Sequence, residues 1–253
     1  MAPFKSYVIC TSPRSGSTLL CRLLAQTGQS GHPNSHFHTP SMAAWLRSYD
    51  LSQTTFPTEL AQIKAVFAAA IARGTQDTGI FGLRLQRDSF DFFMQQLGVL
   101  HPGLATDKDR ISATFGPTLF IHLTRQNKLD QAISLVKANQ TGLWHKSADG
   151  SDLERTAPHQ DPIYDPDEIS RTIDRLTKLD QDWRDWFTAE NITPLTLTYD
   201  DLSTAPAEIL QQITDRLGLP PSVVDGIQPN VAKLADSTSR DWTKRYIEDH
   251  GAP

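Results

Sequence analysis

The stretch YVICTSPRSGSTLLCRLLAQ, residues 7–26, joins an apolar run to a leucine-rich segment through a polar turn. Tyr7–Thr11 has the length and composition of a strand that is buried on both faces of a parallel sheet. Ser17–Gln26 carries leucines at helical spacing, and Gly28 follows it as the expected C-cap. Because the turn connects a strand directly to a helix, the stretch predicts the first strand–helix unit of an α/β fold.

The same alternation of apolar runs and amphipathic segments continues along the chain. It predicts further strands at Gly79–Leu85, Leu119–Leu123 and Ile192–Thr198. It predicts further helices at Ser89–Leu97, Lys128–Asn139, Pro166–Thr188 and Ala205–Leu217. This pattern indicates a parallel sheet flanked by helices, within a single domain that spans residues 1–253. Two polar stretches, residues 30–40 and 141–166, are expected to be long loops bordering the ligand-binding edge of the sheet.

Composition and charge argue against several classes of protein. The net charge of −5 does not suit a nucleic-acid-binding protein, which needs a basic face. No window approaches the ~18 apolar residues of a membrane span, and the N-terminus lacks the apolar core of a signal peptide. The two cysteines, Cys10 and Cys21, are too few for a disulfide scaffold, and no Cys/His spacing suggests zinc. We therefore expect a cytoplasmic protein with no membrane span and no metal site.

The turn TSPRSGST, residues 11–18, has the features of an anion-binding loop. Gly16 can adopt the positive φ of a tight turn, so that the following amides point to one place at the helix N-terminus. Arg14 adds a permanent charge and a two-pronged donor. Three hydroxyl side chains add further donors: Ser15, Ser17 and Thr18. The turn lacks the first glycine and the lysine of a Walker A loop, which weakens the alternative of a P-loop-type kinase.

A second candidate anion site follows the third predicted strand. Arg125 lies in the loop after that strand, and Ser134 lies on the next predicted helix. The guanidinium and the hydroxyl can converge on one phosphate. Two separate phosphate sites suit a nucleotide that is phosphorylated at both ends, which is the shape of 3′-phosphoadenosine 5′-phosphosulfate (PAPS).

Three motifs together resemble the bacterial trehalose-type sulfotransferase family. They are SPRSGST at residues 12–18, Arg125 with QAIS at residues 131–134, and QTGLW at residues 140–144. The chain is also similar, more distantly, to the PAPS-dependent sulfotransferases of animals. The resemblance extends from Tyr7 to about Ile247, and it implies a P-loop-containing nucleotide hydrolase-like three-layer sandwich. A non-catalytic module that binds PAP, the desulfonated product, remains an alternative.

The resemblance implies an enzyme that moves a sulfuryl group from PAPS to a hydroxyl of a carbohydrate or other small molecule. Arg14 and the loop amides would stabilise the leaving phosphate, because positioning and electrostatics carry most of the catalysis in such transfers. The element YDDL, residues 199–202, is similar to one near the adenine site of sulfotransferases, which makes Tyr199 a candidate adenine contact. The family also implies a homodimer.

The general base is the point at which this chain departs from the family pattern. Relatives of the trehalose type carry a Gly-x-Pro-x-Glu-aromatic element that supplies a proposed base. The matching stretch here is GHPNSHFH, residues 31–38, and Ser35 stands at the glutamate position. Histidine titrates near neutral pH, so we expect His36 to act as the base, with His38 and His122 as competitors. The missing glutamate leaves the acceptor open.

Several further residues are candidates for the cleft. Arg84 can hold the transferring group or an anionic acceptor, whereas Arg87 is expected to form a surface ion pair. Trp144 and His145 can form part of an acceptor lid. Near the C-terminus two cations lie one turn apart on an expected helix, where they either reach the 3′-phosphate or form a solvated face: Arg240 and Lys244.

Overall fold

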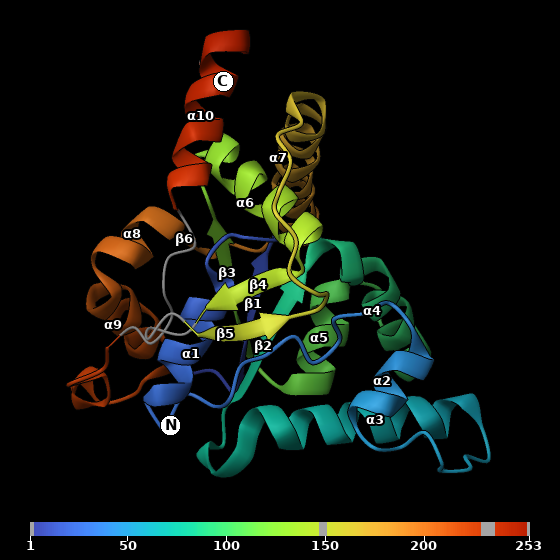
Figure 1. The fold of residues 1–253 in the computed structure, drawn as a ribbon. Coiled ribbons are helices and arrows are strands. Elements are labelled where there is room, and N and C mark those ends of the chain that lie inside the picture. The colour runs from blue at the N-terminus through green and yellow to red at the C-terminus, as the bar shows by residue number, and fades with distance from the viewer. Residues whose placement is uncertain (1–2, 147–150, 229–235, 252–253) are drawn as a thin grey trace.

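A four-stranded parallel sheet lies at the centre of the molecule, in the order β2-β1-β3-β6 (Figure 1). The computed structural model describes residues 3–146, 151–228 and 236–251. The strands are β1 Ser6–Thr11, β2 Phe81–Gln86, β3 Thr118–Thr124 and β6 Leu195–Thr198. The four predicted strands and their parallel arrangement are confirmed, although β6 begins at Leu195 rather than at Ile192.

All of the predicted helices are present, with similar bounds. They are α1 Ser17–Gln26, α4 Arg87–Leu100, α6 Lys128–Thr141, α7 Pro166–Ala189, α9 Pro206–Leu217 and, around Arg240, α10 Ser237–His250. The sequence analysis did not predict α2 Met42–Ser48, α3 Glu59–Thr75, α5 Asp107–Phe115 and α8 Tyr199–Thr204, nor the 3₁₀ turns η1 Gln76–Thr78 and η2 Pro221–Val224. The prediction of a helix depends on a difference in hydrophobicity between its buried and exposed faces. In α3 that difference is small, because alanines lie on both faces.

The polar stretch at residues 141–166 is more ordered than predicted. It contains two strands, β4 Leu143–Lys146 and β5 Asp152–Arg155, which pair antiparallel as a small separate sheet. The prediction of one long loop was therefore wrong for these segments, and residues 147–150 lie outside the described part. In Figure 1 this hairpin crosses in front of the carboxyl ends of the central strands.

The register of the sheet brings three strand ends to one edge. Thr11 at the end of β1 is level with Gln86 of β2 and with Leu123 of β3. The connections after these strands therefore begin side by side. In a parallel sheet this edge is where ligands bind, because the loops and the helix N-termini meet there.

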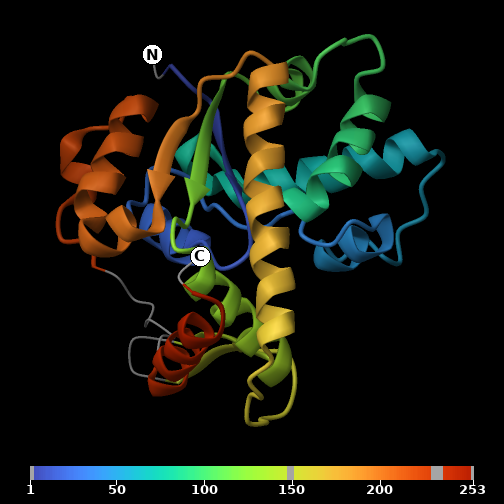
Figure 2. The ribbon, with the colours of Figure 1, turned by 90° about the horizontal axis from the view of Figure 1, so that it is seen from above.

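Helices cover both faces of the sheet, which confirms the three-layer arrangement (Figure 2). Side chains alternate along β1, so Tyr7 and Ile9 pack among α1, α8 and α9 on one face. Val8 and Cys10 pack on the other face among aromatic and aliphatic residues of α3, α4, α5 and α7. A third apolar cluster joins α6, α7 and α10 beyond the carboxyl edge of the sheet.

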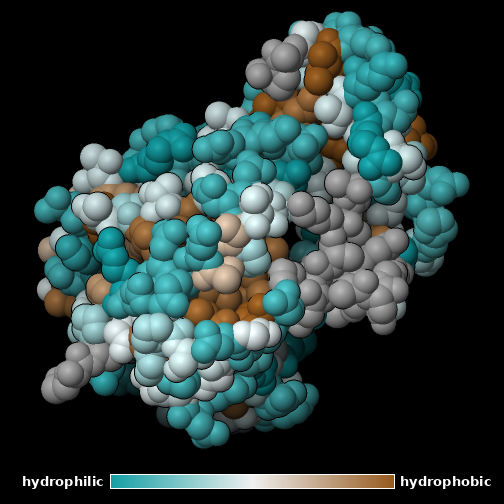
Figure 3. Space-filling model, turned by 90° about the vertical axis from the view of Figure 1, so that its left-hand side faces the viewer, coloured by the Kyte–Doolittle hydropathy of each residue, from teal (hydrophilic) through white to brown (hydrophobic). Residues whose placement is uncertain are grey.

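The outer surface carries few large apolar side chains. Figure 3 views the side that bears α8 and α9, where the surface is mostly hydrophilic and the hydrophobic areas are small and scattered. Among the residues that the structure describes, the most exposed large apolar side chain is that of Ile163, at 74%. Among the described residues, no helix is both long enough and apolar enough to cross a membrane.

Candidate functional site

The loop between β1 and α1 leaves the N-terminus of that helix open to an anion. Gly16 is the N-cap residue with φ of +85°, and no side chain caps the first turn. A Cβ atom at Gly16 would lie 2.4 Å from Cδ2 of Tyr199, so only glycine fits both the turn and the ring packed on it. Arg14 also has a positive φ, of 62°. Free amides at a helix N-terminus, together with the helix dipole, are the features of an anion site.

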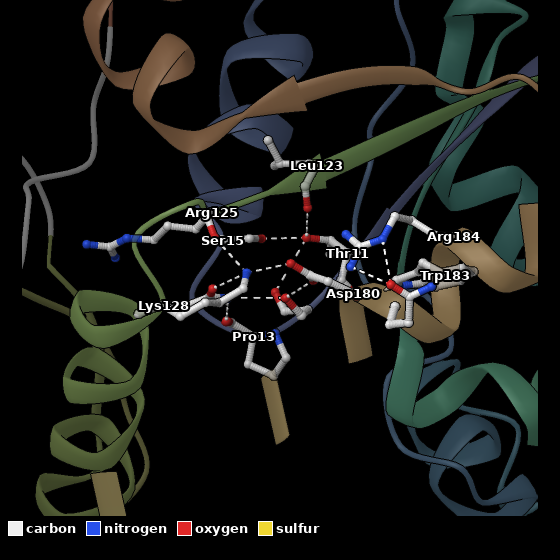
Figure 4. Close-up of polar contacts among 12 residues, drawn as sticks. Thr11, Pro13, Ser15, Leu123, Arg125, Lys128, Asp180, Trp183 and Arg184 are labelled. Carbon is white, nitrogen blue, oxygen red and sulfur yellow. Dashed lines mark hydrogen bonds and ion pairs between the residues drawn. The ribbon is translucent and has the colours of Figure 1, made fainter. Parts of the chain in front are cut away.

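A buried ion pair supports this loop from behind (Figure 4). Asp180 of α7 is 2% exposed and accepts a hydrogen bond from the Ser12 hydroxyl at 2.8 Å. Its other oxygen accepts from Nζ of Lys128 at 2.5 Å. The same ammonium donates to the carbonyl of Arg125 at 2.6 Å. One lysine of α6 thus links the phosphate loop, the loop after β3 and the long helix α7.

Further hydrogen bonds fix the backbone of the loop. Gln131 donates from its amide to the carbonyl of Pro13 at 2.7 Å. The indole of Trp183 donates to the carbonyl of Thr11 at 2.9 Å, and the Thr11 hydroxyl donates to the carbonyl of Leu123 at 2.8 Å. These bonds satisfy buried carbonyls at the end of the sheet and hold the loop in a single conformation.

Arg14 is held beneath the cleft rather than on the surface. Its Nε donates to the Ser134 hydroxyl at 2.9 Å, and its terminal nitrogen donates to the Trp144 carbonyl at 2.5 Å. Burial, followed by the nearby charge of Arg125, lowers the pKa of Arg14 to about 10. Arg14 remains charged at neutral pH, and the repulsion between the two guanidinium groups favours an anion between them.

Arg125 and Tyr199 form the second part of the site. The Arg125 guanidinium carbon lies 4.6 Å from the centre of the Tyr199 ring, a cation–π contact. The same ring packs against Gly16, so it joins the two anchors. Arg125 is 3.8 Å from Asp130, and its buried Nε has no hydrogen-bond partner in the described structure. An unpaired buried donor in a cationic site favours binding of an anion.

A chain of hydrogen bonds borders the other side of the phosphate loop. Arg84 donates from Nε to the Ser35 hydroxyl at 2.7 Å and from a terminal nitrogen to the Thr18 hydroxyl at 2.6 Å. Thr18 is in turn 3.0 Å from Nε2 of His145 on β4. Glu154 of β5 lies 3.6 Å from the same nitrogen. The hairpin therefore brings a histidine and a carboxylate to the phosphate loop.

These groups border one cleft of about 1570 Å³, large enough for a nucleotide together with a second small substrate. Among the predicted binding residues its lining includes Arg14, Gly16, Ser17, Thr18, Arg125, Ser134 and Tyr199. It also includes the other candidates Arg84, His38, Trp144, His145, Arg240 and Lys244. Ser15 lies behind the loop, where its hydroxyl bonds with that of Thr11 at 2.5 Å.

The structure does not bring the predicted base His36 to this cleft. Its side chain lies in the core, where the residue is 5% exposed and the ring stacks on Phe81 at a centroid distance of 5.7 Å. Nε2 is 3.3 Å from the carbonyl of His32. Burial lowers the pKa of His36 to about 4, so the ring is neutral at physiological pH. This location gives His36 a packing role and no path to an acceptor.

The other competing histidines differ in position. His122 is buried against Phe187, and burial lowers its pKa to about 4. His38 lines the cleft, and burial lowers its pKa too. Arg87 bonds Asp91 at 2.8 Å and does not line the cleft, as expected.

Sequence reasoning missed the residues that support the loop and one that faces the cleft: Asp180, Lys128, Gln131 and Glu154. A signal existed for Asp180, because it lies four residues after Leu176 and three before Trp183, on the apolar face of α7. A charged residue at a buried helical position indicates a partner in the fold. No local pattern indicated Glu154, whose place depends on strand pairing. Among the described residues, no group of His, Cys, Asp or Glu side chains is arranged to hold a metal ion.

Comparisons with known proteins match nearly the whole chain. The family model described as Stf0 sulphotransferase matches residues 6–249. A trehalose 2-sulfotransferase of Mycolicibacterium smegmatis is 28% identical over 264 aligned residues, covering 96% of this chain and 95% of that protein. One from Mycobacterium tuberculosis is 26% identical, covering 96% and 94%. A crystal structure of a sulfotransferase from Alicyclobacillus acidocaldarius has a TM-score of 0.43 at 12% identity, covering 98% of this chain and 93% of that one.

Proposed function

The chain belongs to the Stf0 sulphotransferase family, and we propose that it transfers a sulfuryl group from PAPS to a hydroxyl of a carbohydrate. The observation that carries the proposal is the single cleft that joins the open N-terminus of α1 to the Arg125 anchor. A donor with phosphates at both ends needs two such anion sites in one cavity. We propose that one sulfotransferase domain, residues 1–253, contains both.

The residues of the phosphate loop fit the 5′-phosphosulfate. The amides at the start of α1 lack a capping side chain, and Gly16 lets an anion approach the backbone closely. Ser17 and Thr18 line the cleft beside them, while Ser15 supports the loop through Thr11. The absence of a cap leaves these donors available to a ligand.

Arg125 and Ser134 fit the 3′-phosphate. Both line the cleft, and the unpartnered Nε of Arg125 is a donor that a phosphate oxygen would satisfy. Tyr199 presents an aromatic face between the two anchors, as an adenine contact requires. Arg240 and Lys244 of α10 border the same cleft and add positive charge there.

Catalysis then rests on position and charge. PAPS supplies an activated sulfuryl group, and the protein stabilises the phosphate that it leaves behind. Arg14 is fixed by Ser134 and by the Trp144 carbonyl, so it does not need to reorganise as negative charge develops. We therefore assign Arg14 the role of stabilising the leaving phosphate.

The acceptor side of the cleft is polar. Its lining includes amide, hydroxyl and carboxylate groups of Asn34, Ser35, Gln86, Asp88 and Glu154. Gln86 has a buried amide oxygen with no hydrogen-bond partner in the described structure. Such groups bind the hydroxyls of a polyol, and the mycobacterial relatives carry the name trehalose 2-sulfotransferase. These features support a carbohydrate acceptor.

Thermal unfolding with PAP tests the donor assignment. The protein is melted alone and with PAP, with AMP and with ATP–Mg²⁺, as wild type, Arg125→Ala and Arg216→Ala. PAP at ~100 times its dissociation constant adds about 2.7 kcal/mol. At roughly 2–4 °C per kcal/mol for this size, the midpoint should rise by roughly 5–11 °C. Arg216 is exposed on α9, away from the cleft, and serves as the matched control.

We expect a PAP-selective shift in the wild type and in Arg216→Ala that is largely lost in Arg125→Ala. An equal or larger shift with ATP–Mg²⁺ would overturn the PAPS assignment. The acceptor is tested separately by incubation with PAPS and trehalose, glucose or glycerol, and by mass spectrometry of the sulfated product. Detection of no sulfated saccharide would remove the carbohydrate assignment and leave the donor assignment standing.

The predicted homodimer is part of the same proposal. Light scattering at working concentration gives its test, and the mass of a single 28.2 kDa chain would contradict it.

A further inference from the structure

The cleft lacks a carboxylate at the position where the trehalose-type family carries its proposed base. Ser35 occupies that position, and its hydroxyl accepts a hydrogen bond from Nε of Arg84 at 2.7 Å. A serine so placed is a poor proton acceptor near neutral pH. If the chain transfers sulfuryl groups, the proton of the acceptor hydroxyl needs another destination on this side of the cleft.

The hydrogen bonds around Thr18 have a direction that favours an unprotonated Nε2 on His145. Arg84 can only donate, so the Thr18 hydroxyl accepts its hydrogen bond at 2.6 Å. The hydroxyl can then donate its own hydrogen to Nε2 of His145, 3.0 Å away. In that arrangement Nε2 is an acceptor, and the neutral ring carries its proton on Nδ1. The side chain of His145 is 20% exposed and lines the cleft.

Glu154 lies on the strand paired with that of His145. The two residues face each other across the β4–β5 pairing, and Oε2 of Glu154 is 3.6 Å from Nε2. When Nε2 gains a proton, the carboxylate is already in position to pair with the imidazolium. Glu154 also lines the cleft.

We propose that His145 is the general base of the transfer and that Glu154 stabilises its protonated form, in place of the glutamate missing at position 35. This assignment rests on the proposed function. The acceptor oxygen bonds to sulfur as the bond from sulfur to the bridging phosphate oxygen breaks. PAP leaves with that electron pair, and the acceptor proton passes to Nε2 and then to water. Binding of the donor recruits the Thr18 hydroxyl to phosphate, which frees the lone pair of Nε2 to accept the proton.

The charges around His145 make its basicity depend on the bound donor. Burial, and then Arg14, Arg84 and Arg22, lower the pKa of His145 to about 3. Glu154 is half-exposed and solvated, so it offsets these three cations only weakly. The negative charges of PAPS beside Arg14 counter the repulsion and raise the pKa of the ring. The base therefore becomes more basic only when the donor site holds a nucleotide.

His38 is the other cleft histidine among the described residues, and the structure favours it less. Its carbonyl accepts a hydrogen bond from Ser89, which fixes its backbone. Among the described residues, its ring makes no hydrogen bond to the phosphate loop, whereas His145 bonds directly to Thr18. A base must lie close to the reacting sulfur, so contact with the loop decides between them.

Kinetic analysis of His145→Gln and Glu154→Gln tests the assignment. Rates are measured as PAP released from PAPS, with trehalose, glucose and glycerol and with water alone. His159→Gln is the matched control, because His159 also lies 3.6 Å from a carboxylate, that of Asp161, but is 73% exposed and outside the cleft. We expect kcat to fall by ~10²–10⁴-fold in His145→Gln, less in Glu154→Gln, and not at all in His159→Gln.

Three further readouts separate a base from a structural residue. The acid limb of kcat against pH should disappear in His145→Gln and move to lower pH in Glu154→Gln. By NMR, the pKa of His145 should lie well below 6.5 without ligand and rise when PAP binds. Ser35→Glu added to His145→Gln should restore part of the activity, because it returns a carboxylate to the position used in the family.

The outcomes also separate this proposal from the proposed function. A His145→Gln variant with unchanged kcat, or a larger loss in His38→Gln, overturns the assignment of His145. A different result is a wild type that is stabilised by PAP and yet releases no PAP from PAPS, whether an acceptor or only water is present. That result removes the assignment of a base and leaves the donor site standing. Loss of the PAP-induced shift in the wild type removes the proposed function itself.

Discussion

Asp180→Asn tests whether the buried ion pair behind the phosphate loop holds that loop in place. The carboxylate accepts hydrogen bonds from Ser12 and Lys128, and Asp180 is 2% exposed. Asparagine keeps an oxygen for Ser12 but leaves the Lys128 ammonium, whose side chain is 19% exposed, without its counter-charge. Removal of one partner of a buried pair costs ~3–5 kcal/mol, and the partial exposure of Lys128 puts the expected loss near ~3 kcal/mol.

The assay is thermal unfolding with and without PAP. A loss of ~3 kcal/mol lowers the midpoint by roughly 6–12 °C for a chain of this size. Asp182→Asn is the control, because Asp182 is on the same helix and pairs at 2.8 Å with Lys178, whose side chain is 75% exposed. A surface pair contributes about 0–1 kcal/mol, so the control should melt close to the wild type.

Two results decide whether the pair acts as described. Lys128→Met combined with Asp180→Asn removes both charges, so this double variant should be more stable than Asp180→Asn alone. The stabilisation by saturating PAP should also be smaller in Asp180→Asn than in the control, because the loop proposed to bind the 5′ end has lost its support. Equal midpoints for Asp180→Asn and Asp182→Asn would refute the reasoning.

Three other substitutions probe the loop and the core. Gly16→Ala places a Cβ 2.4 Å from the Tyr199 ring at a φ of +85°, so it should abolish the PAP-induced shift in thermal unfolding. Burial lowers the pKa of His36 from 6.5 to about 4, so between these pH values His36 is protonated only in the unfolded chain. The free energy of unfolding therefore decreases as the pH falls through that window. His36→Gln should reduce the loss of unfolding free energy from pH 6.5 to 4, measured in urea, by about 3 kcal/mol. Trp183→Phe leaves the buried Thr11 carbonyl without its donor and should cost ~1–3 kcal/mol in the same urea assay.

The first strand–helix unit was predictable because its determinants are local. The predicted helix Ser17–Gln26 has the same bounds in the structure, and the turn before it contains the glycine and arginine at positive φ. Buried parallel strands are apolar runs that end at polar turns, so β1 and β3 also stood out. The anion site follows from the same segment, since the loop amides and the helix N-terminus are neighbours in sequence.

The hairpin over the cleft could not be predicted in the same way. An isolated two-stranded hairpin is marginal in water, so its position depends on contacts made elsewhere in the fold. Arg14 bonds to the Trp144 carbonyl, and the amide of Thr156 bonds to the carbonyl of Gly142. The second bond closes the base of the hairpin, whereas the first joins residues far apart in sequence and places the hairpin so that His145 faces the phosphate loop.

The failure of His36 as the predicted base has a geometric cause in the backbone beside Ser35. Asn34 pairs in parallel with Leu83 of β2, and its carbonyl accepts a hydrogen bond from the amide of Arg84. Directly after this bridge the chain turns, and the amide of His36 donates to the same carbonyl at 2.9 Å. Ser35 therefore reaches Arg84 in the cleft, while His36 enters the core. A neighbour in sequence cannot replace the missing carboxylate at position 35, so a base has to come from another segment, such as the hairpin, that borders the same side of the cleft.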